Sequence, residues 1–311
     1  MKKLLTLIII LFLCFVFDSY IFKDTIYNVY NKYYNVHNIK IVSNPNILKQ
    51  NEYHNKDLSS LIKETNNYNV SDKDELINVY YTAINNGYEN LTFYCDEYYS
   101  ECMDDINNLD NEENNFSYIN QLVNVFNEYD SIESVYSTDH RVDIKIKRKY
   151  SKEDIKKINN EINNIVNKLG INNYDNVLDK IKVFHDYIAN INTYDSIRAN
   201  TGKSEYHSDN ALGTLFEGKS ICSGYTDTLS IFLDKLNLTN VRVATDKHVW
   251  NAVYIDNEWK HIDLTWDDPL TSDGSNIINY DYYMLSTTDL LNKDDKEHTF
   301  NTDIYSFLKN N

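Results

Sequence analysis

The 311-residue sequence has few glycines (7), prolines (2) and cysteines (4), and it is short of positive charge. Its 47 Asp and Glu outnumber 30 Lys and Arg, so the net charge is −17. No basic patch stands out, and we therefore expect no nucleic-acid partner. We attribute the scarcity of glycine and proline to the base composition of the gene and not to function. Apolar residues make up 42%, enough for one large core or two modest ones.

The N-terminus has the layout of a secretory signal. Two lysines precede a 14-residue apolar run, Leu4 to Phe17. No pair of small residues suited to cleavage follows, because residues 18–22 read DSYIF. We therefore expect residues 1–22 to be an uncleaved signal anchor, with a cleaved signal peptide as the alternative. The rest of the chain is then extracytoplasmic, either membrane-anchored through this segment or secreted.

The cysteines fall into three groups. Cys14 lies in the apolar run. Cys95 and Cys102 are close together in TFYCDEYYSECMDD, where an oxidising compartment would permit a disulfide; two unpaired thiols are the alternative. Cys222 is left alone in GKSICSGY, and a single free thiol in an exported protein calls for an explanation.

Pattern changes divide the remaining chain into three parts. Residues 23–70 are polar and weakly periodic, and we expect a stalk. Residues 71–149 combine helices near 72–86 and 117–127 with strands at SIESVYS and RVDIKIKRKY, which predicts an accessory α+β region. Residues 150–311 open with the capping box SKED and a helix, and they form the expected second domain.

The setting of Cys222 suits a nucleophile. Apolar residues at positions 229, 232, 233 and 236 predict one helix face after it, and Ser220 is the expected N-cap. Cys222 would then lie in the first turn, where free N–H groups and the helix dipole favour anions. A thiolate is one such anion, and the oxyanion of a tetrahedral intermediate is another.

A hairpin is predicted further along, in KHVWNAVYIDNEWKHIDLTWDDP. Two sets of residues alternate with the period of a strand: His248, Trp250, Ala252 and Tyr254, and Val249, Asn251, Val253 and Ile255. Asp256 and Asn257 tolerate the positive φ of a tight turn. With a two-residue turn, Ile255 pairs with Glu258, and the returning strand is expected to continue to Trp266.

This register puts two chemically useful groups on one face. His248 and Asp263 become diagonal neighbours, within reach of each other's side chains. Asp263 could therefore orient the imidazole while His248 withdraws the proton of the Cys222 thiol. These are the nucleophile, base and orienting acid of covalent acyl transfer.

The motifs GKSICSGY, HVWNAVYIDNEW and HIDLTWDDP resemble the three motif blocks of the transglutaminase-like superfamily, in the same order. The segment FHDYIANINTYD and the tail NYDYYMLSTTDL, followed by His298, resemble its exported bacterial members. The resemblance covers residues 150–300. It implies an α+β, papain-like fold with a cysteine-bearing helix packed on an antiparallel sheet, preceded here by the small α+β region. It also implies Cys222 as nucleophile, His248 as general base and Asp263 as its partner.

Other interpretations remain open for several residues. His261 shares the face of Asp263 and could be taken for the base. A metal site of Cys222, His248, His261 and Asp263 has suitable ligand types but lacks close paired spacing, so no metal is predicted. Trp250 and Tyr194 are candidates for the cleft rim or for substrate binding.

The predicted function is cysteine-dependent acyl transfer on protein or peptide carboxamides through a thioester, as in a transglutaminase, deamidase or protease. No cofactor is expected, and no acidic calcium loop is present in the sequence. The expected substrates are proteins or peptides, including those of the cell envelope. The alternative is a non-catalytic binding or scaffold protein of the same fold at the cell surface.

Overall fold

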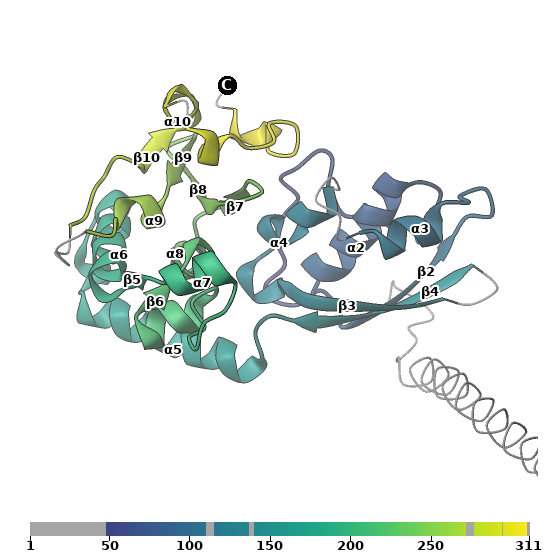
Figure 1. The fold of residues 1–311 in the computed structure, drawn as a ribbon, viewed down its shortest axis with the longest axis horizontal. Helices are drawn as coiled ribbons and strands as arrows, with labels where there is room; N and C mark the ends of the chain where they lie inside the picture. Colours follow the sequence, from purple (N-terminus) through teal and green to yellow (C-terminus); the bar gives the residue numbers. More distant parts are fainter. Residues whose placement is uncertain (1–47, 110–114, 137–139, 272–276, 294, 310–311) are drawn as a thin grey trace, which may run out of the picture.

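The computed structural model describes residues 48–109, 115–136, 140–271, 277–293 and 295–309. They form two lobes that lie side by side (Figure 1). Residues 48–149 make the first lobe and residues 150–309 the second.

The first lobe is a sheet with helices on one side (Figure 1). Its elements are β1 (Asn69–Val70), α2 (Lys73–Asn85), β2 (Asn90–Cys95), α3 (Cys102–Asn107), η2 (Asn115–Tyr118), α4 (Ile119–Leu122), η3 (Val125–Asn127), β3 (Tyr129–Tyr136) and β4 (Arg141–Arg148). The sheet order is β1-β2-β4-β3, antiparallel except for the β1–β2 pair. Val142, Ile144 and Ile146 of β4 are buried, as their alternation with charged residues predicts.

The second lobe carries the cysteine-bearing helix. Its elements are α5 (Lys152–Lys168), η4 (Ile171–Asn173), α6 (Val177–Ile191), β5 (Thr193–Tyr194), α7 (Ser196–Thr201), η5 (Gly213–Glu217), β6 (Lys219–Ser220), α8 (Cys222–Lys235), β7 (Asn240–Ala244), β8 (Val249–Ile255), β9 (Glu258–Ile262), α9 (Leu264–Asp267), β10 (Tyr283–Ser286), α10 (Thr287–Asn292), η6 (Lys296–His298) and η7 (Ser306–Leu308). Strands β10-β9-β8-β7 form an antiparallel sheet, and α8 packs on β7 and β8.

The two faces of this second sheet pack into different cores. Val243, Trp250 and Trp259 face the core of the first lobe, together with the C-terminal tail. Val253 and Ile262 face the core of the second lobe, which includes α8. The sheet is therefore the shared wall of the two lobes, and the accessory region is packed against the second lobe rather than tethered to it.

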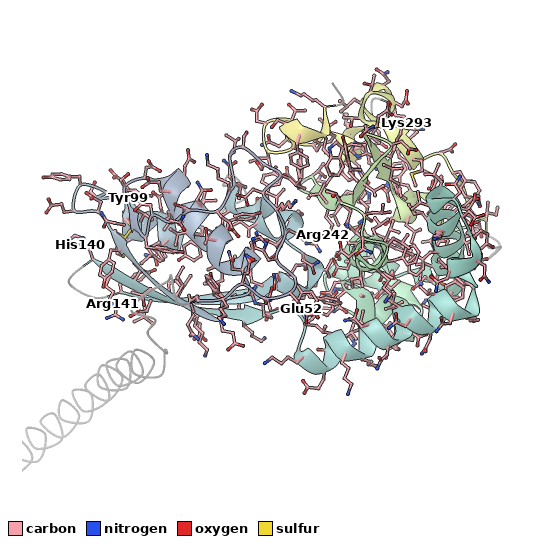
Figure 2. The ribbon with its side chains drawn as sticks, turned by 180° about the vertical axis from the view of Figure 1, so that it is seen from behind. Glu52, Tyr99, His140, Arg141, Arg242 and Lys293 are labelled. Atoms are coloured by element: carbon pink, nitrogen blue, oxygen red, sulfur yellow. A yellow bond between two sulfur atoms is a disulfide. The ribbon has the colours of Figure 1, made fainter. Side chains whose placement is uncertain are left out.

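The disulfide and the N-terminal segment are relevant to the expected location of the protein outside the cytoplasm. Cys95 and Cys102 form a disulfide that ties the end of β2 to the start of α3, with Cα atoms 6.1 Å apart. Figure 2 shows it as a yellow bond near Tyr99. The segment 1–22, with Cys14, lies outside the described residues. Among the residues that the structure does describe, no helix is long and apolar enough to cross a membrane.

Three predicted elements differ in the structure. Residues 48–70, assigned to a polar stalk, pack on the first lobe: Ile62 is buried, and Val70 belongs to β1. The single helix expected at 117–127 is divided into η2, α4 and η3, because the chain turns to an extended conformation at Val123. The returning strand ends at Ile262 and not at Trp266, because α9 begins at Leu264.

Candidate active site

Cys222 is the first residue of α8, and it is the free cysteine among the described residues. The N-cap is Ile221, which has an extended backbone and offers no side-chain cap. Ser220, the predicted N-cap, is buried, and its hydroxyl bonds Thr214 Oγ1 (2.7 Å) and Asn192 Oδ1 (3.1 Å) instead. Without a side-chain cap, the N–H groups of the first turn remain available next to Cys222, a partly exposed residue, and they favour an anion there.

Gly224 explains the glycine in CSGY. A Cβ at this position would lie 2.5 Å from the backbone oxygen of Ser208, closer than any side chain tolerates. The same loop holds the residue before the cysteine, since Ile221 N donates to Ser208 O at 2.7 Å. The start of α8 is thus fixed by direct backbone contact with residue 208.

The predicted hairpin register is the one observed. Asp256 and Asn257 have φ of 53° and 65°, and Ile255 pairs with Glu258. His248 therefore lies directly before β8, and Asp263 lies directly after β9, at the same end of the hairpin. His248 Nε2 and Asp263 Oδ2 are 2.5 Å apart, and both side chains are buried.

Cys222 enters the site through its effect on the pKa of His248. Because Nε2 of His248 is engaged by Asp263, Nδ1 is the nitrogen left to face a thiol. Burial lowers the pKa of His248, but the charge of Asp263 and the bonds to Asp263 and Cys222 outweigh it and raise this pKa to about 10. A pKa in this range keeps the imidazole protonated near neutral pH.

Asp263 has a second structural role as the N-cap of α9. Its Oδ1 accepts from the backbone N–H of Thr265 (3.0 Å) and of Trp266 (3.2 Å). Burial raises the pKa of this carboxyl, but His248 and His298 outweigh the effect, and the pKa falls to about 2. Asp263 is therefore a carboxylate, and the start of α9 holds its Oδ1.

His298 is a member of the site to which the sequence assigned no role. Its Nε2 lies 2.8 Å from Asp263 Oδ2, and its Nδ1 lies 3.0 Å from Asp295 Oδ2. Its exposed fraction is 1%. The residue follows Asp263 by 35 positions, in the short helix η6, so no periodic pattern connects the two.

The two predicted rim residues have different environments. Tyr194 is half-buried, and this burial raises the pKa of its hydroxyl. Trp250 is 1% exposed and so does not form a rim. It stacks behind His248 at 5.8 Å between ring centroids, and its Nε1 donates to His261 Nδ1. The exposed aromatic residue near His248 is Trp266.

His261 is unsuited to the role of base. Its Nδ1 accepts from Trp250 at 3.0 Å, and its Nε2 lies 3.0 Å from Thr287 Oγ1. Burial, followed by the charge of His298, lowers its pKa to about 3. The ring is a buried packing group with both nitrogens occupied.

The described residues that could hold a metal are His248, Asp263 and His298, whose ligand atoms lie within 4.8 Å of one another. Neither Cys222 nor His261 belongs to this group, although both were in the set considered from the sequence. Both imidazoles contact the same carboxylate oxygen, at 2.5 and 2.8 Å. Ligands around a tetrahedral zinc, each about 2.0 Å from it, lie roughly 3.3 Å apart. The spacing is that of hydrogen bonds.

These features give the α+β arrangement that the sequence predicted, in which the cysteine-bearing helix packs on an antiparallel sheet. The sequence matches no protein-family model and no curated protein.

Two solved structures are similar in part. One, "Crystal structure of a TGase", is 19% identical over 44% of each chain, with a TM-score of 0.33. The other, a putative cysteine protease from Cytophaga hutchinsonii, is 15% identical over 48% of this chain and 65% of its own, with a TM-score of 0.28. The similarity spans less than two thirds of either neighbour. Neither TM-score reaches 0.5, so the case for function rests on the site itself.

Proposed function

We propose that this protein is a cysteine-dependent acyl-transfer enzyme acting on protein or peptide carboxamides. The observation that carries the proposal is the buried pair of His248 and Asp263, 2.5 Å apart, with Cys222 among the groups that raise the pKa of His248. Nucleophile, base and orienting acid in this order are the constellation of covalent acyl transfer.

In the proposed mechanism, the Cys222 thiolate attacks the carboxamide or peptide carbonyl carbon and forms a C–S bond. The free N–H groups at the start of α8 stabilise the resulting oxyanion. His248 gives its proton to the leaving nitrogen as the C–N bond breaks, which releases ammonia or an amine and leaves a thioester. An amine or water then attacks the thioester, returns a proton to His248 and frees the thiolate. The route needs no cofactor.

The proposed setting is outside the cytoplasm, at the membrane through residues 1–22. The Cys95–Cys102 disulfide supports it, because stable disulfides are typical of exported proteins. Envelope proteins or peptides are the proposed substrates. Recovery of the untagged protein from the cytosolic fraction of its host would contradict this location.

The activity is tested by alkylation of the full-length protein with iodoacetamide near neutral pH. The Cys222-containing peptide is followed by mass spectrometry, which separates it from Cys14. Fast modification that becomes slow in His248→Ala supports the enzyme. A rate no faster than that of a free cysteine, and equal in both proteins, supports the scaffold alternative.

The type of acyl transfer is resolved with a glutamine peptide, with and without a labelled primary amine. Incorporation of the amine indicates cross-linking. Release of ammonia without incorporation indicates deamidation, and chain cleavage indicates proteolysis. Cys222→Ser is the control, since it removes the nucleophile, and turnover that persists in this variant would refute the assignment.

A further inference from the structure

His298 contacts a carboxylate with each ring nitrogen: Nε2 faces Asp263 Oδ2 at 2.8 Å, and Nδ1 faces Asp295 Oδ2 at 3.0 Å. A carboxylate oxygen only accepts hydrogen bonds, so both bonds form together only when both nitrogens carry hydrogen. The geometry is therefore that of an imidazolium held between two carboxylates. Its ring centroid lies 5.2 Å from that of His248.

The position of His298 is firmly set by its neighbours. Asp295, its outer partner, accepts from Tyr282 Oη at 2.7 Å and, through Oδ1, from Glu297 N at 2.9 Å. The His298 ring stacks on Tyr282 with centroids 4.6 Å apart and meets Trp250 edge-on at 4.7 Å. These contacts leave the imidazole little freedom other than to direct Nε2 at Asp263.

One oxygen of Asp263, Oδ2, is consequently the partner of two imidazole rings. His248 and His298 both approach Oδ2, while Oδ1 is used by the backbone of α9. A hydrogen bond or a positive charge near a carboxylate reduces what it offers a third group. The strength of the interaction between Asp263 and His248 is therefore set in part by His298.

We infer that His298 is a positioning residue of this site: by sharing Asp263 Oδ2, it fixes the direction of the carboxylate and limits how tightly His248 holds its proton. The inference rests on the proposed function, in which His248 must release that proton to the leaving nitrogen. A carboxylate devoted to His248 alone would hold the proton more strongly, and the nearby charge of His298 opposes this.

Several titratable or charged groups surround His298 and enter any pH dependence. From the elements packed around it these are Asp263 at the start of α9, Asp295 and Glu297 at η6, His248 before β8, His261 in β9, Tyr282 before β10, Lys293 over the Tyr282 ring, and Tyr194 and Cys222 across the site. Of these, Asp263 and His248 are the ones that the variants below are designed to report.

The test is the pH dependence of Cys222 alkylation by iodoacetate. An anionic reagent reacts fastest with a thiolate beside an imidazolium, so the rate falls when His248 loses its proton. This fall at high pH, called the upper limb of the pH profile, reports how strongly Asp263 stabilises the protonated form of His248. The variants are His298→Phe, which removes donor and charge, and His298→Gln, which removes the charge but keeps an N–H donor.

The upper limb is expected to move to higher pH in both variants, by about 1 pH unit for loss of a like charge at this distance. The plateau rate is expected to fall more in His298→Phe, because only the glutamine can still direct Asp263. The matched control is His185→Gln: His185 is also fully buried between two carboxylates, Asp186 and Asp267, and its loss should leave the limb in place.

The outcomes separate the two proposals. A wild-type protein without fast, bell-shaped alkylation refutes the proposed function. If the wild-type rate shows a maximum with pH, but the fall in rate at high pH stays in place or moves to lower pH in the His298 variants, only the role of His298 is refuted. If His298→Phe fails to fold, as judged by circular dichroism, the glutamine variant carries the test.

Discussion

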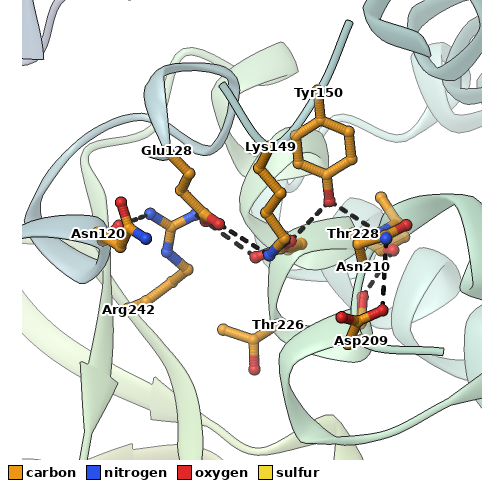
Figure 3. Close-up of polar contacts among 12 residues, drawn as sticks. Asn120, Glu128, Lys149, Tyr150, Asp209, Asn210, Thr226, Thr228 and Arg242 are labelled. Carbon is orange, nitrogen blue, oxygen red and sulfur yellow. Dashed lines mark hydrogen bonds and ion pairs between the residues drawn. The ribbon is translucent and has the colours of Figure 1, made fainter. Parts of the chain in front are cut away.

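The buried charge cluster between the lobes predicts a loss of stability for Lys149→Met. Lys149 Nζ lies 2.7 Å from Glu128 Oε2 and 2.7 Å from Asp227 Oδ2, and both carboxylates are at most 6% exposed (Figure 3). Asp227 belongs to α8, the helix that begins with Cys222, so the cluster ties that helix to the first lobe. The substitution removes one cation and leaves two buried carboxylates.

The size of the stability loss depends on the partners that Glu128 and Asp227 keep in Lys149→Met. Breaking a buried ion pair from one side costs about 3–5 kcal/mol. Arg242 still pairs with Glu128 and lies 3.5 Å from Asp227, which also accepts from Tyr150 Oη at 2.6 Å. We therefore expect the lower end, a loss of about 3 kcal/mol in the free energy of unfolding.

Lys147→Met is the matched control. Its ion pair with Asp130 is equally short at 2.6 Å, but the two side chains are 72% and 48% exposed. Such a pair contributes about 0–1 kcal/mol. Urea unfolding followed by tryptophan fluorescence measures both variants against the wild-type protein.

The pH dependence gives a second check. Burial raises the pKa of Glu128, and loss of Lys149 raises it further. A carboxyl with a raised pKa takes up a proton more readily in the folded state, so the deficit of Lys149→Met should shrink as the pH is lowered. Equal losses in the two lysine variants, or a deficit that grows in acid, would refute this account of the cluster.

Three further predictions concern the site and the first lobe. Asp263→Asn should slow alkylation of Cys222 by about 10²- to 10⁴-fold at neutral pH, because the imidazole loses its orienting charge; an unchanged rate would contradict the role of Asp263. Replacing Cys95 and Cys102 by serine opens a loop with a separation of 7 residues and should lower the free energy of unfolding by about 2 kcal/mol, measured in urea. The pKa of His248 is raised from 6.5 to about 10 and that of Asp263 is lowered from 3.8 to about 2, so the stabilisation by the pair is complete between 3.8 and 6.5 and declines outside that window. The difference in unfolding free energy between the wild-type protein and His248→Gln should therefore decrease as the pH rises from 6.5 towards 10.

The hairpin was predictable because its determinants are local. Period-two alternation set the faces, and two adjacent residues that tolerate positive φ set the turn, so the pairing of Ile255 with Glu258 followed. The placement of His248 and Asp263 at one end of the hairpin needed no information from elsewhere in the chain.

The end of β9 was missed although a signal was present. Asp263 is an N-cap whose side chain accepts from Thr265 N and Trp266 N, and aspartate is a favoured residue in that position. The alternation continues through Leu264 to Trp266, and it concealed the start of α9. A carboxylate that caps a helix has one oxygen held by backbone N–H groups, which a strand residue would lack.

His298 and residues 48–70 could not be placed from the sequence for a different reason. His298 meets Asp263 across 35 positions and lies in a helix of three residues. Ile62 and Val70 bury themselves on elements that follow them in the chain, without a period of their own. Such contacts depend on tertiary packing, which no local pattern encodes.

The C-terminal tail connects the first lobe to the segments that carry His248 and His298. Tyr305 is buried in the core that the first lobe shares with the second sheet, and its hydroxyl accepts from Ala244 N at the end of β7. The next residue, Thr245, accepts from His248 N at 3.1 Å and donates to Glu297 O at 3.2 Å.

The turn that holds His248 and the short helix that holds His298 are therefore fastened to each other at Thr245. The first lobe covers the apolar face behind them, where Trp250 lies. Without that cover, Trp250 and its neighbours would be exposed to water, and the tail would lose the surface on which it packs. The accessory region thus has a structural part in keeping both imidazoles directed at Asp263.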